Sequence, residues 1–126
     1  MKISTILKIT KSTLLTEGVD LEQEIKGGFA GDLMSDVLAS INPDAVLITG
    51  LSNPQVVRTA MIADAKMIIF ARGKHPSQET LALAESESIP VAASPMGLYA
   101  IAGILTQAGL PSYENPLYHK PKKIDK

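Results

Sequence analysis

Three short apolar runs, each leading to a polar residue, a proline and a helical pattern, constrain this chain more than any other feature. The runs are Ala45–Thr49, Met67–Ala71 and Ile89–Ala93. Continuous apolar runs of this length are typical of strands that are buried on both faces of a sheet. The prolines that follow stand where helices begin, at Asn53-Pro54, His75-Pro76 and Ser94-Pro95. Strands that alternate with helices over short connections indicate a parallel sheet covered by helices.

The segments on either side of these units extend the same pattern. Asp32 precedes an apolar pattern of helical period, which predicts a helix that begins with this residue as its N-cap and stops at Asn42-Pro43. The last helix is expected to end at Gly109, a glycine suited to the left-handed C-cap conformation. In the first 30 residues we expect a short helix over 4–9 and strands over 13–16 and 25–30. The Gly27-Gly28 pair in the second strand indicates a bulge or a close backbone approach.

Composition sets the limits of the fold. The 126 residues, 45% hydrophobic and 20% charged, suit one α/β domain with a mostly parallel sheet of about four strands flanked by helices. We expect this domain to cover residues 1–110 and residues 111–126 to form an extended or disordered basic tail. Residues 119–126 carry a net charge of +3, so the first 118 residues carry −4.

Several functional classes are disfavoured by composition. The chain has no cysteine, which excludes disulfides and thiolate chemistry. Its apolar stretches are too short to span a bilayer or to form a signal peptide, so we expect a cytoplasmic protein without membrane contact. A mildly acidic body does not attract nucleic acid, and the basic tail could instead contact an acidic protein partner.

A ligand site is expected at the carboxyl edge of the strands, where ligands bind in parallel α/β sheets. Helix N-termini there offer unpaired backbone N–H groups to an anion, and two glycine-containing loops allow close backbone approach. Phosphate or carboxylate is the natural ligand, although the same residue types are needed at any helix start. The candidate binding residues are Gly31, Asp32, Thr49, Gly50, Ser52, Asn53, Arg72, Gly73, Lys74 and Ser94.

Catalytic and metal motifs are weak by comparison. Lys74 is followed by His75 rather than Ser or Thr, so no P-loop can be identified, and neither His75 nor His119 has metal-ligand spacing. Asp32 and Asp36 could share a cation, but a helix cap and a solvent-facing carboxylate explain them equally well. Hydroxyls of Thr49, Ser52 and Ser94 are nucleophiles on paper, with His75 as the only nearby base. We therefore expect no metal, no cofactor and no catalysis.

Four segments resemble a stand-alone DRTGG-domain protein. They are Gly27–Ala39 (GGFAGDLMSDVLA), Val46–Ala60 (VLITGLSNPQVVRTA), Phe70–Lys74 (FARGK) and Ile89–Val91 (IPV), in the family's order. The resemblance covers roughly residues 1–110. The string Asp-Arg-Thr-Gly-Gly itself is missing, and its closest echoes are Gly31-Asp32 and Thr49-Gly50. The family is similar in fold to the N-terminal domains of HPr kinase/phosphorylase and of the Mur ligase that adds the terminal dipeptide.

The resemblance implies a regulatory or dimerising role, because related domains accompany CBS domains in regulated pyrophosphatases and precede some phosphotransacetylases. We therefore expect a non-catalytic module that binds a nucleotide or another phosphate-bearing metabolite, forms a homodimer, or does both. Two alternatives remain open: a protein-interaction subunit without a small ligand, and a small phosphotransferase or hydrolase.

Overall fold

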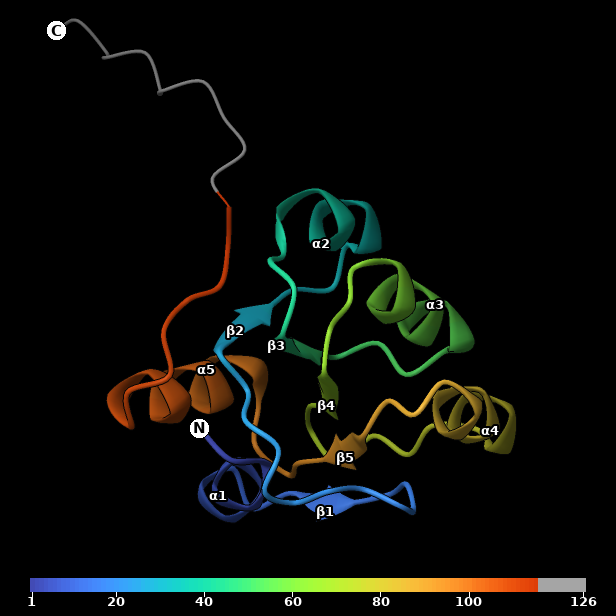
Figure 1. The fold of residues 1–126 in the computed structure, drawn as a ribbon, viewed down its shortest axis with the longest axis horizontal. Helices are drawn as coiled ribbons and strands as arrows, with labels where there is room; N and C mark the ends of the chain where they lie inside the picture. Colours follow the sequence, from blue (N-terminus) through green and yellow to red (C-terminus); the bar gives the residue numbers. More distant parts are fainter. Residues whose placement is uncertain (116–126) are drawn as a thin grey trace, which may run out of the picture.

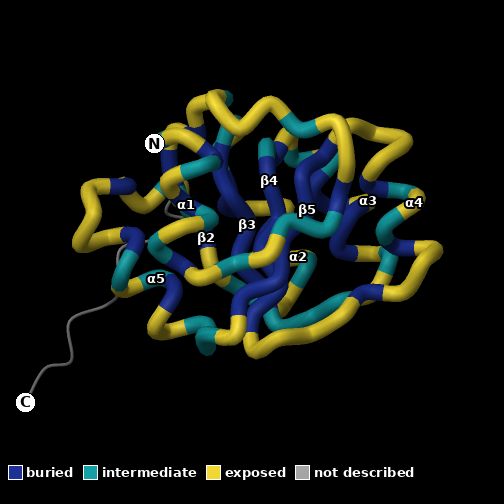
Figure 2. The backbone as a smooth tube through the Cα atoms, turned by 90° about the horizontal axis from the view of Figure 1, so that it is seen from below, coloured by how far each residue is buried: buried dark blue, intermediate teal, exposed yellow. Residues whose placement is uncertain are grey.

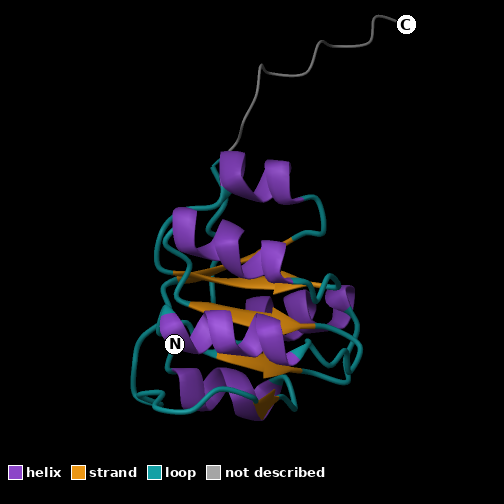
Figure 3. Ribbon diagram, turned by 90° about the vertical axis from the view of Figure 1, so that its right-hand side faces the viewer, coloured by secondary structure: helices purple, strands orange, loops and turns teal. Residues whose placement is uncertain are grey.

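The computed structural model describes residues 1–115 and places helices on both faces of one sheet (Figures 1 and 3). The helices are α1 (Ile3–Ile9), α2 (Met34–Ser40), α3 (Pro54–Ile62), α4 (Gln78–Ser86) and α5 (Leu98–Gln107). The strands are β1 (Thr13–Leu14), β2 (Gly27–Ala30), β3 (Ala45–Thr49), β4 (Met67–Phe70) and β5 (Val91–Ala93).

The sheet has five strands in the order β1-β5-β4-β3-β2. The four strands from β2 to β5 pair in parallel, in a register that sets Gly28 beside Val46 and Val46 beside Met67. Strand β1 pairs antiparallel with β5. The expected mostly parallel sheet of about four strands is thus corrected to one mixed sheet of five. Its antiparallel edge strand has only two residues, too few to give a clear alternation in the sequence.

Two buried clusters lie on the two faces of the sheet, because the strands contribute alternate side chains to each face. On one face Leu47, Ile68 and Phe70 pack against α2, α3 and α4. On the other face Val46, Ile48 and Ile69 pack under α1 and α5. Every residue of β3 and β4 is buried (Figure 2), as expected for continuous apolar runs. Because β2 to β5 are parallel, the carboxyl ends of these four strands lie together at one edge of the sheet.

The ends of the helices confirm one sequence expectation and correct another. Helix α5 ends as predicted, with Gly109 at φ +100° and the Leu110 amide donating to the carbonyl of Leu105. Helix α2 does not have Asp32 as its N-cap. The N-cap is Leu33, whose side chain has no atom that could accept a capping bond, and the Asp32 carboxylate binds Thr49 and Gly50 instead.

The segment after α5, Leu110–Asn115, runs along the outer edge of β2, and we call it the C-terminal strap. Gly28 accepts a hydrogen bond from the Tyr113 amide and donates one to the carbonyl of Pro111. The Tyr113 ring lies so close to Gly27 that a Cβ there would overlap it. Of the two predicted alternatives for Gly27-Gly28, a bulge or a close backbone approach, the pairing of Gly28 with the C-terminal strap supports the second. The Tyr113 ring gives a physical reason for glycine at position 27.

Residues 116–126, which hold most of the predicted basic tail and His119, lie outside the described residues. The boundary between a domain and a tail therefore stays a prediction. Within residues 1–115, no helix is both long and apolar enough to cross a membrane. The same residues contain no group of three or more histidine or acidic side chains that could hold a metal ion.

Candidate functional site

The loops after β2 and β3 are joined by one carboxylate. The Asp32 Oδ1 atom accepts hydrogen bonds from the Thr49 hydroxyl at 3.0 Å and from the Gly50 amide at 2.7 Å. A Cβ at position 50 would lie 3.4 Å from Oδ2 of this carboxylate, at an ordinary van der Waals distance. We call this contact the Asp32 clamp. It brings together Gly31-Asp32 and Thr49-Gly50, which lie 17 to 18 residues apart in the chain.

Beside the Asp32 clamp lies an open hollow of about 560 Å³, which we call the edge hollow. It is formed by the loop from β3 to α3 and the loop from β4 to α4. Its lining residues are Gly50, Leu51, Ser52, Asn53, Pro54, Lys74, His75 and Ser77. The four predicted residues Gly50, Ser52, Asn53 and Lys74 are therefore gathered at one place.

The N-terminus of α3 supplies hydrogen-bond donors to the edge hollow. Asn53 is the N-cap, but its side chain makes no capping bond, and Pro54 at the first helical position has no N–H. Within residues 1–115 the backbone N–H groups of Ser52, Asn53 and Gln55 have no hydrogen-bond partner. Unpaired donors at a helix N-terminus attract negatively charged oxygen atoms.

Four lining residues were not among the predicted binding residues: Leu51, Pro54, His75 and Ser77. The last two have polar side chains. Ser77 is the N-cap of α4 and accepts a hydrogen bond from the Thr80 amide. The sequence signal for it was weak, because the position three residues after Ser77 is Thr rather than the Glu or Gln of a capping box. His75, assigned from sequence to the solvent or to the helix start, is exposed and lines the edge hollow.

Arg72 and Gly73 form a left-handed turn next to the edge hollow rather than part of its lining. Their φ angles are +64° and +66°, and their amides donate to the carbonyls of Met96 and Ser94, respectively. A non-glycine residue is uncommon in this conformation. The turn re-aims the chain so that Lys74, the next residue, reaches the edge hollow.

Ser94 and Thr49 are fully buried, contrary to the expectation of accessible edge residues. The Ser94 hydroxyl donates to the carbonyl of Thr10 at 2.6 Å and accepts from the Met96 amide at 3.1 Å. The Thr49 hydroxyl donates to Asp32 and accepts from the Leu51 amide. Both hydroxyls form hydrogen bonds inside the protein, so at these strand ends they stabilise the fold and do not face a ligand.

Charge is distributed unevenly between the two ends of the sheet. The loops at the amino ends of the parallel strands, together with the last turn of α4, carry a concentration of acidic side chains: Glu17, Asp20, Glu22, Glu24, Asp44, Asp64, Glu85 and Glu87. Arg72 and Lys74 are at the carboxyl edge. Two groups at the acidic end, Lys2 and Glu24, have shifted pKa values. Glu22 raises the pKa of Lys2 by hydrogen bonding and by its charge, and the amino terminus lowers the pKa of Glu24. The amino terminus, Lys2, Lys26 and Lys66 neutralise part of the acidic end. Asp32 offsets part of the positive charge of the carboxyl edge, so Lys74 acts on an anion locally.

The order of the described strands creates no ligand crevice at the edge hollow. Ligand crevices in open α/β sheets form where the strand order reverses. Strands β2 to β5 are consecutive neighbours, and α2, α3 and α4 all lie on the same face (Figure 1). The described strands thus contain no such reversal, and any affinity at this edge must come from the loops.

The family model of the DRTGG domain matches residues 5–108. The chain belongs to the DRTGG family. A search of curated proteins found no match. Gly31-Asp32 and Thr49-Gly50, the closest echoes of the family's name string, are the residues that the Asp32 clamp joins.

A solved structure with the same fold contains the CBS and DRTGG domains of the regulatory region of Clostridium perfringens pyrophosphatase, complexed with its activator diadenosine tetraphosphate. The TM-score is 0.72 at 17% sequence identity. The likeness covers 87% of this chain and 47% of that chain, so the present chain spans about half of the solved one. At this identity the comparison establishes the shared fold.

Proposed function

We propose that this DRTGG domain is a non-catalytic regulatory module that binds a nucleotide or another phosphate-bearing metabolite in the edge hollow. The observation that carries this proposal is the meeting of two unpaired backbone N–H groups, those of Ser52 and Asn53, with Lys74 at one open hollow. Backbone donors at a helix N-terminus and a lysine ammonium are common phosphate-binding groups. The nucleotide activator of the pyrophosphatase regulatory region is consistent with the same ligand class.

The Asp32 clamp favours a nucleotide over inorganic phosphate. Asp32 is exposed, and within residues 1–115 its Oδ2 atom accepts no hydrogen bond. A free carboxylate oxygen repels phosphate but accepts hydrogen bonds from hydroxyl groups. A ligand with a phosphate at one end and sugar hydroxyls at the other suits both Lys74 and Asp32.

Catalysis is disfavoured because the candidate nucleophiles are not available. The Thr49 and Ser94 hydroxyls are buried in internal hydrogen bonds, which leaves Ser52 with His75 at the edge hollow. A nucleophile needs a base within hydrogen-bonding reach, and no hydrogen bond joins these two side chains in the described residues. Release of phosphate from ATP at a rate that depends on Ser52 or His75 would contradict a non-catalytic role.

The test is a thermal-shift and NMR titration of the full chain with AMP, ADP, ATP and inorganic phosphate. A nucleotide at 100 times its Kd should stabilise the domain by about 2.7 kcal/mol. Lys74→Ala should weaken binding, whereas Lys8→Ala removes the same charge from α1 and should leave the Kd unchanged. The absence of a shift with every nucleotide, or equal effects of the two variants, would argue against binding at the edge hollow.

A second function, assembly through α5, is favoured by the chemistry of that helix. Residues 88–113 contain no charged side chain, and Tyr99 on the outer side of α5 is 94% exposed. An exposed uncharged helix face can be covered by a second copy in a two-fold dimer. Sedimentation should show a concentration-dependent dimer that Tyr99→Glu disrupts. A monomer at every concentration would remove this support.

A further inference from the structure

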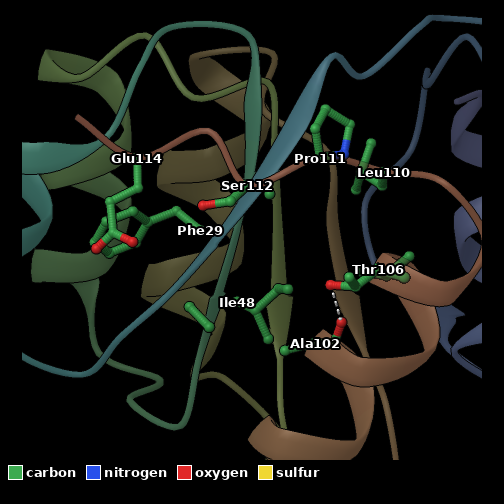
Figure 4. Close-up of a pocket in the computed structure, with 11 residues that line it drawn as sticks. Phe29, Ile48, Ala102, Thr106, Leu110, Pro111, Ser112 and Glu114 are labelled. Atoms are coloured by element: carbon green, nitrogen blue, oxygen red, sulfur yellow. Dashed lines mark hydrogen bonds between the residues drawn. The ribbon is translucent and has the colours of Figure 1, made fainter. Parts of the chain in front are cut away.

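A second hollow, of about 230 Å³, lies on the α5 side of the sheet, between β2, α5 and the C-terminal strap (Figure 4). We call it the strap hollow. It shares no lining residue with the edge hollow. Its volume corresponds to about eight water molecules at ~30 Å³ each, the volume of one water in the liquid, and thus to a ligand of about eight non-hydrogen atoms.

Small residues on facing elements account for the strap hollow. Gly28 and Ala30 point to the α5 side of β2, because alternate residues of a strand share a face and a Cβ at Gly28 would contact Leu110 and Val46. On α5 the lining residue Ala102 has a one-carbon side chain. The C-terminal strap covers this gap from the side of Leu110 and Pro111 (Figure 4).

The lining residues define the chemistry of a ligand. Ile48, Leu105 and Leu110 form apolar walls. The Thr106 hydroxyl already donates to the carbonyl of Ala102 at 2.8 Å, so its oxygen is left as an acceptor. Glu114 is the one charged lining residue, and it forms no ion pair with another described residue.

The residues that line the strap hollow differ between its two ends. Ala102 and Thr106 lie at one end of the group drawn in Figure 4, and the Glu114 carboxylate lies at the other, beyond Ser112. We propose that the strap hollow binds a small organic amine, with its apolar body against Ile48 and Leu105 and its ammonium group toward Glu114. A carboxylate that forms no ion pair among residues 1–115 favours a cation over an anion, so an amine suits the strap hollow better than a phosphate-bearing ligand.

The probe is phenethylamine, whose nine non-hydrogen atoms suit the volume by the same water-based measure. Phenylacetate has a similar body with the opposite charge, and benzyl alcohol has a neutral end. In an amide NMR titration of the full chain, phenethylamine should shift the signals of Gly28, Ala30, Ala102 and Ser112. Phenylacetate should bind at least about fivefold more weakly, as expected for a partly exposed ion pair.

Variants separate the charge from the cavity. Glu114→Gln should weaken phenethylamine binding about fivefold and leave benzyl alcohol unchanged. Ala102→Leu should fill the strap hollow and remove all three ligands. Because Ala102 is half-buried, Ala30→Leu at an exposed lining position provides a second filling variant that keeps the fold. Lys74→Ala should leave amine binding intact, which keeps this test separate from that of the edge hollow.

Three results would overturn the proposal. Equal binding of phenethylamine and phenylacetate would remove the role of Glu114. Shifts at Gly50–Asn53 in place of Gly28 and Ala102 would place the amine in the edge hollow. Unchanged binding in both Ala30→Leu and Ala102→Leu, or the absence of any shift at millimolar amine, would show that the strap hollow takes no such ligand.

Discussion

Removal of the Asp32 carboxylate tests the contact that organises the carboxyl edge. Asp32→Ala deletes hydrogen bonds of 3.0 Å and 2.7 Å from the Thr49 hydroxyl and the Gly50 amide. The Gly50 amide is solvent-accessible and can bind water afterwards, whereas the Thr49 hydroxyl is buried and loses its acceptor. A hydrogen bond to a charged group contributes about 1.5–3 kcal/mol. Because the Asp32 carboxylate is exposed to water, each of its two bonds is expected to contribute less than this range. We therefore expect Asp32→Ala to lower the free energy of unfolding by about 2 kcal/mol in total.

The assay is urea unfolding followed by circular dichroism, with thermal unfolding as a second measurement. A loss of 2 kcal/mol corresponds to a decrease in Tm of about 8 °C for a domain of this size. The matched variant Asp32→Asn keeps an oxygen that accepts both hydrogen bonds and should lose less than about 1 kcal/mol. A double-mutant cycle with Thr49→Val should give a coupling energy of about 1 kcal/mol.

The cycle also distinguishes the Asp32 clamp from the helix cap that the sequence predicted. An N-cap aspartate would be worth about 1 kcal/mol as well, but it would not depend on Thr49. The Asp32 clamp would be refuted if the losses in free energy of unfolding for Asp32→Ala and Thr49→Val were additive. It would also be refuted if Asp32→Asn and Asp32→Ala lost the same free energy.

Three further substitutions test buried contacts elsewhere in the domain. Gly27→Ala should destabilise the domain by about 1–3 kcal/mol because a Cβ overlaps the Tyr113 ring, and Tyr113→Ala should restore most of that loss in the same urea assay. Thr59→Val should be neutral or raise the Tm by up to about 4 °C, since the Thr59 hydroxyl is buried without a partner in the described residues, and a decrease would mean that the hydroxyl is paired. Ser94→Ala should lose about 1–3 kcal/mol because it leaves the Thr10 carbonyl unpaired, and a loss under 0.5 kcal/mol would contradict the buried contact.

Much of the fold could be predicted because it depends on local patterns. The apolar run Ala45–Thr49 is strand β3 with the same bounds, and Met67–Ala71 differs from β4 by one residue. Burial on both faces leaves an unbroken apolar signal that a short segment can display. The Gly109 cap was equally readable, because left-handed helix ends need glycine.

The remaining features depend on contacts between distant segments, which local patterns do not encode. Asp32 satisfies the rule for an N-cap, yet a partner 17 residues away takes its carboxylate. Ser94 is a polar residue at a strand end, and only the packing of α1 shows that its hydroxyl bonds to Thr10. The position of the C-terminal strap follows from Tyr113 against Gly27, a pair separated by most of the chain.

Strand β3 is common to the two hollows: its end leads into the loop that lines the edge hollow, and with β2 it lines the strap hollow. If both proposed ligands bind, this arrangement has a thermodynamic consequence. Ala30 and Ile48 line the strap hollow, and each stands within two residues of a group in the Asp32 clamp. A ligand that moves the ends of β2 and β3 therefore displaces both sites at once. Coupling between two binding sites is reciprocal, so a change in nucleotide Kd caused by bound amine must equal the change in amine Kd caused by bound nucleotide. Rigid strand ends would instead give two independent affinities.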